Sequence, residues 1–352
     1  MSLASSPPSE TSYEVPACDI NAPFSLQDKE KRWLTLYPLL LERGYRLPPR
    51  YRPGWIGSWI RDGVPIDAVD PIKYEDAFDR TLCVSGAVDA ERVSDGKTVA
   101  IKIAFSLREA EAELPILRYF SQPELVNHPL NHCVPLLDTF RLQMGTEELV
   151  IIVEPFVGSP AHPLLIVGVE CLPYVRQMLE ALYFMHMHNT AHRDIFVWNI
   201  AMDSSRLFPR GYNPLNDRPK GNILKAFPKS GVDFVETPGS RDRIDLDPDD
   251  VKYYFLDFDA SIQFASPEER QLVARGVRRL NAAPEEGEDG KSPCDPFPID
   301  VYSLGQYFLY DEAFADIDKT VCVLNDFVMR PHFARATGSG STALAVFLDD
   351  TG

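Results

Sequence analysis

His192-Arg193-Asp194-Ile195-Phe196-Val197-Trp198-Asn199 is the most informative stretch of the chain, because it places a carboxylate, Asp194, five positions before a carboxamide, Asn199. A segment with apolar residues at helical spacing, Val169 to His186, predicts a helix directly before it. Taken alone, this spacing of one acid and one amide is a moderate signal. Its weight comes from the segments that accompany it upstream and downstream.

Two such segments carry one charged residue each. Upstream, Thr98-Val99-Ala100-Ile101-Lys102-Ile103 is a β-branched run that predicts a strand, and Ser94-Asp95-Gly96-Lys97 before it is a hairpin signal. Downstream, Asp257-Phe258 follows the apolar run Tyr253 to Leu256. A strand lysine by itself is more often a solvated edge residue, and only the downstream segments favour a functional role for Lys102.

These three segments, in this order, resemble the strand lysine, the catalytic loop and the metal-binding segment of eukaryotic protein kinases. The resemblance covers residues 78–345. Two more motifs fit it, the end of the activation segment and the buried helix beneath the catalytic loop: Ala283-Pro284-Glu285 and Asp300-Val301-Tyr302-Ser303-Leu304-Gly305. It implies an α+β, bilobal protein-kinase-like fold, with a small antiparallel β-sheet lobe and a helical large lobe.

The resemblance also implies a role for each polar residue of these motifs. Lys102 would face the phosphates of ATP and pair with Glu113, although Pro115 inside the same predicted helix could bend it. Asp194 would position the acceptor hydroxyl, while Asn199 and Asp257 would bind Mg²⁺. The implied catalytic residues are therefore Asp194, Lys102, Glu113 and Asn199, and the implied metal ligands are Asn199 and Asp257.

Nucleotide binding would involve two further segments. Val153-Glu154-Pro155-Phe156 fits the hinge that meets adenine through backbone groups, so Val153, Glu154 and Phe156 are predicted to contact the base. Gly86 is the one glycine between Leu82 and Val88, where the superfamily has three to let the backbone approach phosphate. ATP and Mg²⁺ are the predicted cofactors.

A narrower resemblance is to the kinase-like proteins expanded in mushroom-forming (basidiomycete) fungi. It rests on four motifs outside the catalytic segments: Arg43-Gly44-Tyr45-Arg46-Leu47, Tyr51-Arg52-Pro53-Gly54-Trp55, Asn131-His132-Cys133-Val134-Pro135-Leu136-Leu137-Asp138 and Asp295-Pro296-Phe297.

The main functional hypothesis is a protein kinase that moves the γ-phosphate of ATP to a protein hydroxyl, with Ser or Thr favoured over Tyr. Three departures favour a pseudokinase, acting as a binding or scaffold module, as the alternative. Gly86 stands alone, Asp259 replaces the glycine of Asp-Phe-Gly, and Phe196 replaces a lysine that contacts the transferred phosphate. A small-molecule kinase is the second alternative, since such enzymes share the Asp-to-Asn spacing of the loop.

Predicted strands come first and helices later, which favours an α+β arrangement. Strands are expected at Glu91 to Ala104, Val134 to Phe140 and Glu148 to Phe156, with a helix from Ser106 to Tyr119 between the first two. The predicted domains are a disordered tail (1–27), an N-terminal arm (28–77), a small lobe (78–157), and a large lobe (158–352) with an insertion at 204–250 and shortened C-terminal helices.

The amino-acid composition limits the classes of partner that we expect the protein to bind. Of 352 residues, 35 are Lys or Arg and 52 are Asp or Glu, giving a net charge of −17, so nucleic-acid binding through clustered positive charge is not expected. No apolar run is long enough for a membrane span, and six widely spaced cysteines suggest free thiols. We expect an intracellular protein, cytoplasmic or nuclear, with a protein substrate whose identity, like the oligomeric state, the sequence does not indicate.

Overall fold

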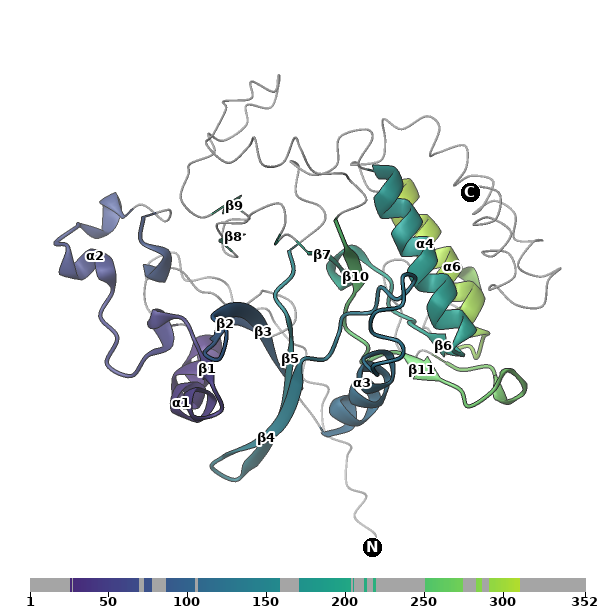
Figure 1. Ribbon diagram of the computed structural model, residues 1–352, viewed down its shortest axis with the longest axis horizontal. Coiled ribbons are helices and arrows are strands. Elements are labelled where there is room, and N and C mark those ends of the chain that lie inside the picture. The colour runs from purple at the N-terminus through teal and green to yellow at the C-terminus, as the bar shows by residue number, and fades with distance from the viewer. Residues whose placement is uncertain are drawn as a thin grey trace, which may run out of the picture.

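The structure of the protein is a computed structural model (Figure 1). It describes residues 26, 28–69, 73–77, 87–104, 107–158, 171–203, 205, 212–213, 218–219, 251–274, 283–286 and 291–310. Predictions for Gly86, for most of the tail and the insertion, and for the chain after Tyr310 lie outside the described residues.

The described elements make a mixed α/β structure with an antiparallel sheet. The helices are α1 (Asp28–Glu42), α2 (Ser58–Arg61), α3 (Leu107–Phe120), α4 (Cys171–Met187) and α6 (Pro296–Tyr310), with short 3-10 turns η1 (Pro49–Tyr51), η2 (Ile66–Ala68), η3 (Glu75–Ala77), η5 (Val197–Asn199), η7 (Pro267–Glu269) and η8 (Pro284–Glu286). The strands are β1 (Tyr45–Arg46), β2 (Val88–Arg92), β3 (Lys97–Ala104), β4 (Asp138–Met144), β5 (Glu147–Pro155), β6 (Thr190–Ala191), β7 (Ile200–Met202), β8 (Tyr212–Asn213), β9 (Arg218–Pro219), β10 (Tyr253–Phe255) and β11 (Ile262–Gln263).

The largest sheet has five antiparallel strands in the order β1-β2-β3-β5-β4. The predicted hairpin between β2 and β3 is confirmed, and Gly96 at its turn has a φ of +70°, which a side chain would disfavour. Strand side chains alternate between two faces, so Lys102 shares a face with its cross-strand partner Ile152, and Ala100 with Glu154.

One face of this sheet is covered by the N-terminal arm, as Figure 1 shows for α1 beside β1, β2 and β3. Trp33, Leu36 and Leu40 of α1 are fully buried against β-branched residues of β3 and β5. The arm also supplies β1, which pairs with β2 and extends the sheet by one strand. The sequence predicted an ordered arm able to pack, but it did not predict this strand, because two residues carry no periodicity.

The opposite face of the sheet belongs to a second hydrophobic core. Val150 and Ile152 of β5 pack there with apolar residues of α3, α4 and α6, and Figure 1 shows α4 and α6 lying side by side. On either side of the predicted insertion, β7 and β10 pair as antiparallel strands. Within the part of the chain that is described, no helix is long and apolar enough to cross a membrane.

One predicted strand begins later than expected. The run from Val134 to Phe140 was expected to be extended throughout, but β4 starts at Asp138. Val134 instead donates its backbone N–H to the carbonyl of Phe255 beside β10, at 3.0 Å, and is fully buried. Its apolar character therefore reflects packing in the second core and not membership of the sheet.

The arm is closed by a buried ion pair. Arg50 Nε and Nη2 donate to the Glu30 carboxylate at 2.7 and 3.0 Å, and both side chains are at most 1% exposed. Arg50 Nη1 also donates to the carbonyls of Asp76 and Ala77, at 3.2 and 3.1 Å. One guanidinium thus joins α1, η1 and η3.

Glu30→Gln is expected to lower the free energy of unfolding by about 3 kcal/mol, because it leaves a buried guanidinium without its countercharge. The matched control is Glu91→Gln in the half-exposed pair with Arg46, whose loss is expected to cost less than about 1 kcal/mol. Urea denaturation measures both. Equal effects would contradict a buried ion pair as a structural element of the arm.

Candidate active site

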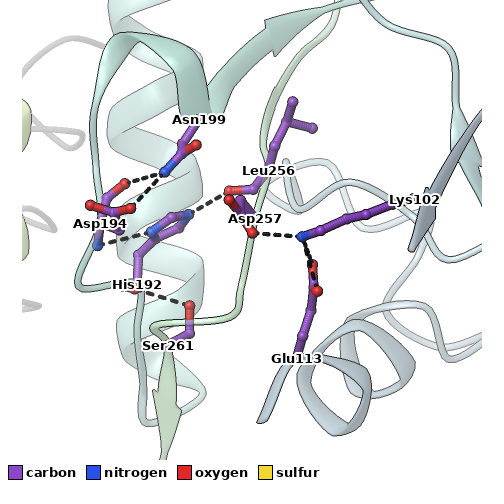
Figure 2. Close-up of polar contacts among 8 residues, drawn as sticks. All are labelled: Lys102, Glu113, His192, Asp194, Asn199, Leu256, Asp257 and Ser261. Carbon is purple, nitrogen blue, oxygen red and sulfur yellow. Dashed lines mark hydrogen bonds and ion pairs between the residues drawn. The ribbon is translucent and has the colours of Figure 1, made fainter. Parts of the chain in front are cut away.

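Two carboxylates, those of Glu113 and Asp257, meet at the ammonium group of Lys102, as Figure 2 shows. Lys102 Nζ, on β3, donates to both carboxylate oxygens of Glu113 at 2.8 and 3.0 Å, and to Asp257 Oδ1 at 2.6 Å. Glu113 lies on α3, and Asp257 follows β10. The lysine therefore connects the sheet, the helix packed on it and the segment after β10.

The helix that carries Glu113 tolerates Pro115. It runs from Leu107 to Phe120 without interruption, and Glu113 is fully buried with its carboxylate on Lys102. Glu113 is thus the partner of the lysine. Leu114, Ile116 and Leu117 are buried in the second core, so packing of this face holds the helix where the proline removes a backbone donor.

The electrostatics around Lys102 are strongly negative. Burial opposes its charge, but the carboxylates of Glu113 and Asp257 outweigh that effect and raise the pKa of Lys102, so the ammonium persists at neutral pH. A third carboxyl, Glu154, lies nearby on β5. Burial, together with the negative charge of Glu113, raises the pKa of Glu154 to about 8.

The loop with Asp194 and Asn199 is held by hydrogen bonds within itself. Asn199 Nδ2 donates to the Asp194 carbonyl at 2.8 Å and to its carboxylate at 3.0 Å, and both residues are buried (Figure 2). His192 Nδ1 accepts from the Asp194 N–H at 3.2 Å, so its Nε2 is the nitrogen that donates to the Leu256 carbonyl at 3.0 Å. The loop and the Asp257 segment are thereby tied together.

Asp300 on α6 lies beneath the loop, and its fully buried carboxylate holds the first residues of the loop in place. It accepts the backbone N–H groups of His192 and Arg193 at 2.7 and 2.6 Å, and His186 Nε2 lies 3.1 Å away. Arg193 has a φ of +66°, which costs a non-glycine residue on the order of 1–3 kcal/mol. The bond from its N–H to Asp300 offsets that strain.

The side chain of Arg193 reaches the segment that follows Asp257. It donates to the carbonyls of Ala260 and Ala274 at 3.1 and 2.9 Å. At the end of this region the sequence motif placed Glu285, but the structure exposes Glu285 and buries its neighbour Glu286, which accepts the N–H of Ala283 at 2.8 Å. The carboxylate of Glu286 therefore closes this turn on Ala283.

The side-chain oxygens of Asp257 and Asn199 could act as ligands of a magnesium ion. Because the Asn199 amide nitrogen is used on Asp194, its side-chain oxygen is the atom left for a cation, and Asp257 contributes carboxylate oxygen. Hard cations prefer such oxygen ligands, and Mg²⁺ in nucleotide sites fills its other positions with phosphate and water. Among the described residues there is no cluster of three or more His, Cys, Asp or Glu suited to a metal.

The predicted base-contacting residues separate in space. Val153 is fully buried on the face covered by the arm, whereas Glu154 lies on the face of Lys102, and Phe156 follows the end of β5, partly buried. Trp198, in the loop beside Asn199, is 60% exposed and was not predicted as a site residue.

Comparison with known proteins shows a partial likeness to a protein kinase. The chain is 31% identical over 121 residues to a probable serine/threonine-protein kinase KIN1 homolog of Enterocytozoon bieneusi (strain H348), which is 33% of this chain and 20% of that protein. The chain thus matches about a fifth of the length of this relative. No protein-family model matches. The likeness supports a place in the protein-kinase-like superfamily, while the narrower fungal resemblance stays a prediction.

Asp300→Asn is expected to lower the free energy of unfolding by about 2–4 kcal/mol, because an amide donor would face backbone N–H donors in a buried place. Asp295→Asn, directly before the same helix, is the control. Asp295 is exposed and accepts the N–H of Phe297, and asparagine caps as well as aspartate, so its change should stay within about 0.5 kcal/mol. Guanidinium denaturation distinguishes the two variants, and similar small effects would refute the anchoring role.

As pH rises from 5 to 8, the free energy of unfolding of Glu154→Gln is expected to increase relative to that of the wild type. Over this window native Glu154, with a pKa of about 8, keeps a proton that the unfolded chain has lost, so wild-type stability falls with pH. Glutamine does not titrate, and the difference should grow by at most about 1.4 kcal/mol per pH unit. Urea titrations at four pH values measure it, with exposed Glu148→Gln tracking the wild type. A difference independent of pH would contradict a neutral Glu154.

Proposed function

We propose that the protein is a kinase-like phosphotransferase that binds ATP with Mg²⁺ and transfers the γ-phosphate to a hydroxyl of a protein, Ser or Thr before Tyr. The observation that carries this proposal is the meeting of Lys102, Glu113 and Asp257 beside the Asp194 to Asn199 loop. A bilobal arrangement, with the five-stranded sheet in the small lobe and α4 and α6 in the large lobe, belongs to the same proposal.

Each residue has a chemical task in this reaction. Lys102 would neutralise phosphate oxygens, and Glu113 would hold its ammonium in place. Asn199 and Asp257 would hold Mg²⁺, which when bound neutralises negative charge on the phosphates. Asp194 would orient the acceptor hydroxyl and take its proton as the acceptor oxygen bonds to the γ-phosphorus. The bond to the bridging oxygen breaks, and ADP leaves.

The geometry supports alignment as the main source of rate. Asp194 is buried and oriented by the Asn199 amide, so little reorganisation is needed before the hydroxyl is positioned. Lys102 is held between two carboxylates, and when ATP binds, its ammonium would form part of its hydrogen bonds to phosphate oxygens instead. A cation held in place in this way stabilises a highly anionic ligand.

A binding module without transfer is the second candidate. It is favoured by Phe196, an apolar residue between Asp194 and Asn199 where a lysine would contact the transferred phosphate, and by Asp259, which adds negative charge near Glu113. Transfer of labelled γ-phosphate to panels of peptides and small molecules decides between the candidates. Nucleotide binding without any transfer would favour the module, and labelling of small molecules alone would favour a small-molecule kinase.

Asp257→Asn and Asp194→Asn are expected to differ. The first removes a carboxylate from the metal site and should weaken the Mg²⁺-dependent part of ATP binding, measured as a smaller thermal shift. The second should keep that shift and reduce phosphate transfer by roughly 10²-fold or more, the scale of a lost proton acceptor.

Asp95→Asn, in the exposed turn between β2 and β3, is the control and should match the wild type in binding and transfer. Full turnover in Asp194→Asn would show that the catalytic assignment is wrong. An unchanged thermal shift in Asp257→Asn would remove this residue from the metal site.

A further inference from the structure

The segment from Phe258 to Ala274 follows the proposed metal site, and one of its side chains, Arg270, reaches back to helix α4. Arg270 Nη2 donates to the carbonyl of His186 at 2.8 Å, and its Nη2 and Nε donate to Asn189 Oδ1 at 2.7 and 3.1 Å. Its guanidinium carbon lies 3.9 Å from the ring centroid of Phe297 on α6. Arg270 therefore joins the segment to the end of α4 and the start of α6.

The end of α4 is suited to receive this cation. The last carbonyls of a helix lack partners within it and form the negative end of its dipole, so a guanidinium there is favourable. Asn189, two residues after the helix, has a φ of +54°, a left-handed conformation that asparagine tolerates at such a position. Its own carbonyl accepts the N–H of Phe264 at 2.9 Å. Asn189 thus receives two separate residues of the segment.

The loop that contains the proposed catalytic acid holds the same segment from the other side. Arg193 donates to the carbonyls of Ala260 and Ala274 at 3.1 and 2.9 Å, close to the two ends of the segment. Ser261 is buried, and its hydroxyl donates to the carbonyl of His192 at 3.0 Å (Figure 2). The position of the segment and that of the loop are therefore coupled.

These contacts occupy the groups that a regulatory phosphate would use. Phosphorylation orders a segment by giving arginines an anionic partner, yet Arg193 and Arg270 already bind oxygens of the chain itself. The segment contains two hydroxyl residues, Ser261 and Ser266. The first is buried, and the hydroxyl of the second is bonded to the carboxylate of Glu268, which would repel a phosphate.

We propose that Arg270 is a positioning residue for phosphate transfer. It holds the segment after Asp257 in place in the unmodified chain, so transfer requires no prior phosphorylation of this segment. The inference rests on the proposed function and adds to it how that activity is regulated. Arg270 acts through Asn189 and the end of α4, so its loss should lower the rate of transfer and leave nucleotide binding unchanged.

The first test compares the full chain before and after phosphatase treatment, with mass spectrometry to verify that no phosphate remains. Two quantities are measured, the transfer of labelled γ-phosphate to peptides and the hydrogen exchange of the segment from Phe258 to Ala274. Treatment should leave transfer unchanged within about twofold, because the segment already has its partners. Exchange should not change either. Ser266→Ala should behave as the treated wild type.

The second test removes the guanidinium. Arg270→Leu should lower kcat roughly tenfold or more, the scale of a lost hydrogen bond to a charged group, and should keep the thermal shift with MgATP. Hydrogen exchange should become faster in the segment and stay the same in β3. Arg270→Lys keeps the charge and one donor, so its kcat should lie between those of the wild type and Arg270→Leu. Arg141→Leu, whose side chain is 62% exposed on β4, is the control and should match the wild type.

Asn189→Gly tests the contact from its other partner. Glycine accepts the left-handed backbone without strain, but it lacks the oxygen that Arg270 binds. The variant should therefore lower kcat and speed exchange in the segment. Because both changes remove the same contact, the double variant with Arg270→Leu should be no slower than Arg270→Leu alone.

Loss of transfer after phosphatase treatment or in Ser266→Ala would overturn the inference and leave the proposed function standing. Wild-type kcat and exchange in Arg270→Leu, or full additivity of the two changes in the double variant, would also overturn it. A wild type that transfers phosphate to no acceptor would overturn the proposed function and the claim about transfer with it. The exchange data would then still show whether Arg270 holds the segment.

Discussion

The buried carboxylate of Asp300 holds the loop on which the proposed chemistry depends. Two backbone N–H groups and the ring of His186 converge on it from elements far apart in the sequence. Arg193, whose N–H it accepts, has a left-handed conformation, and the next residue, Asp194, is hydrogen-bonded to Asn199 just before β7. A carboxylate suits this position since it accepts several bonds at once and donates none.

A second constraint is charge balance around Lys102. One ammonium faces the carboxylates of Glu113 and Asp257 directly, and Glu154 adds a third carboxyl nearby. Three ionised acids around one cation would be costly in a buried place, so the neutral state of Glu154 completes the balance. The same arrangement leaves Lys102 poised between the sheet and the segment after β10, where a ligand with phosphate groups would compete for it.

The arm and Lys102 use opposite faces of one sheet. Side chains of β3 alternate, so Ile101 and Ile103 pack under α1 while Lys102 points toward Glu113. The arm keeps the face that carries Ile101 and Ile103 out of water, and it does not cover the face that carries Lys102. The buried pair of Arg50 and Glu30 secures that cover, which makes the arm part of the same folded unit as the sheet.

The sequence alone predicted the β2–β3 hairpin and helix α3, since these follow from local periodicity and turn residues. It also singled out Lys102, Asp194 and Asp257. Only the tertiary structure showed that β1 joins the sheet, that β4 starts at Asp138, that Glu286 is buried, and that Glu154 shares a face with Lys102. Those features depend on contacts between segments far apart in the chain, and a periodic pattern within one segment carries no record of what packs against it.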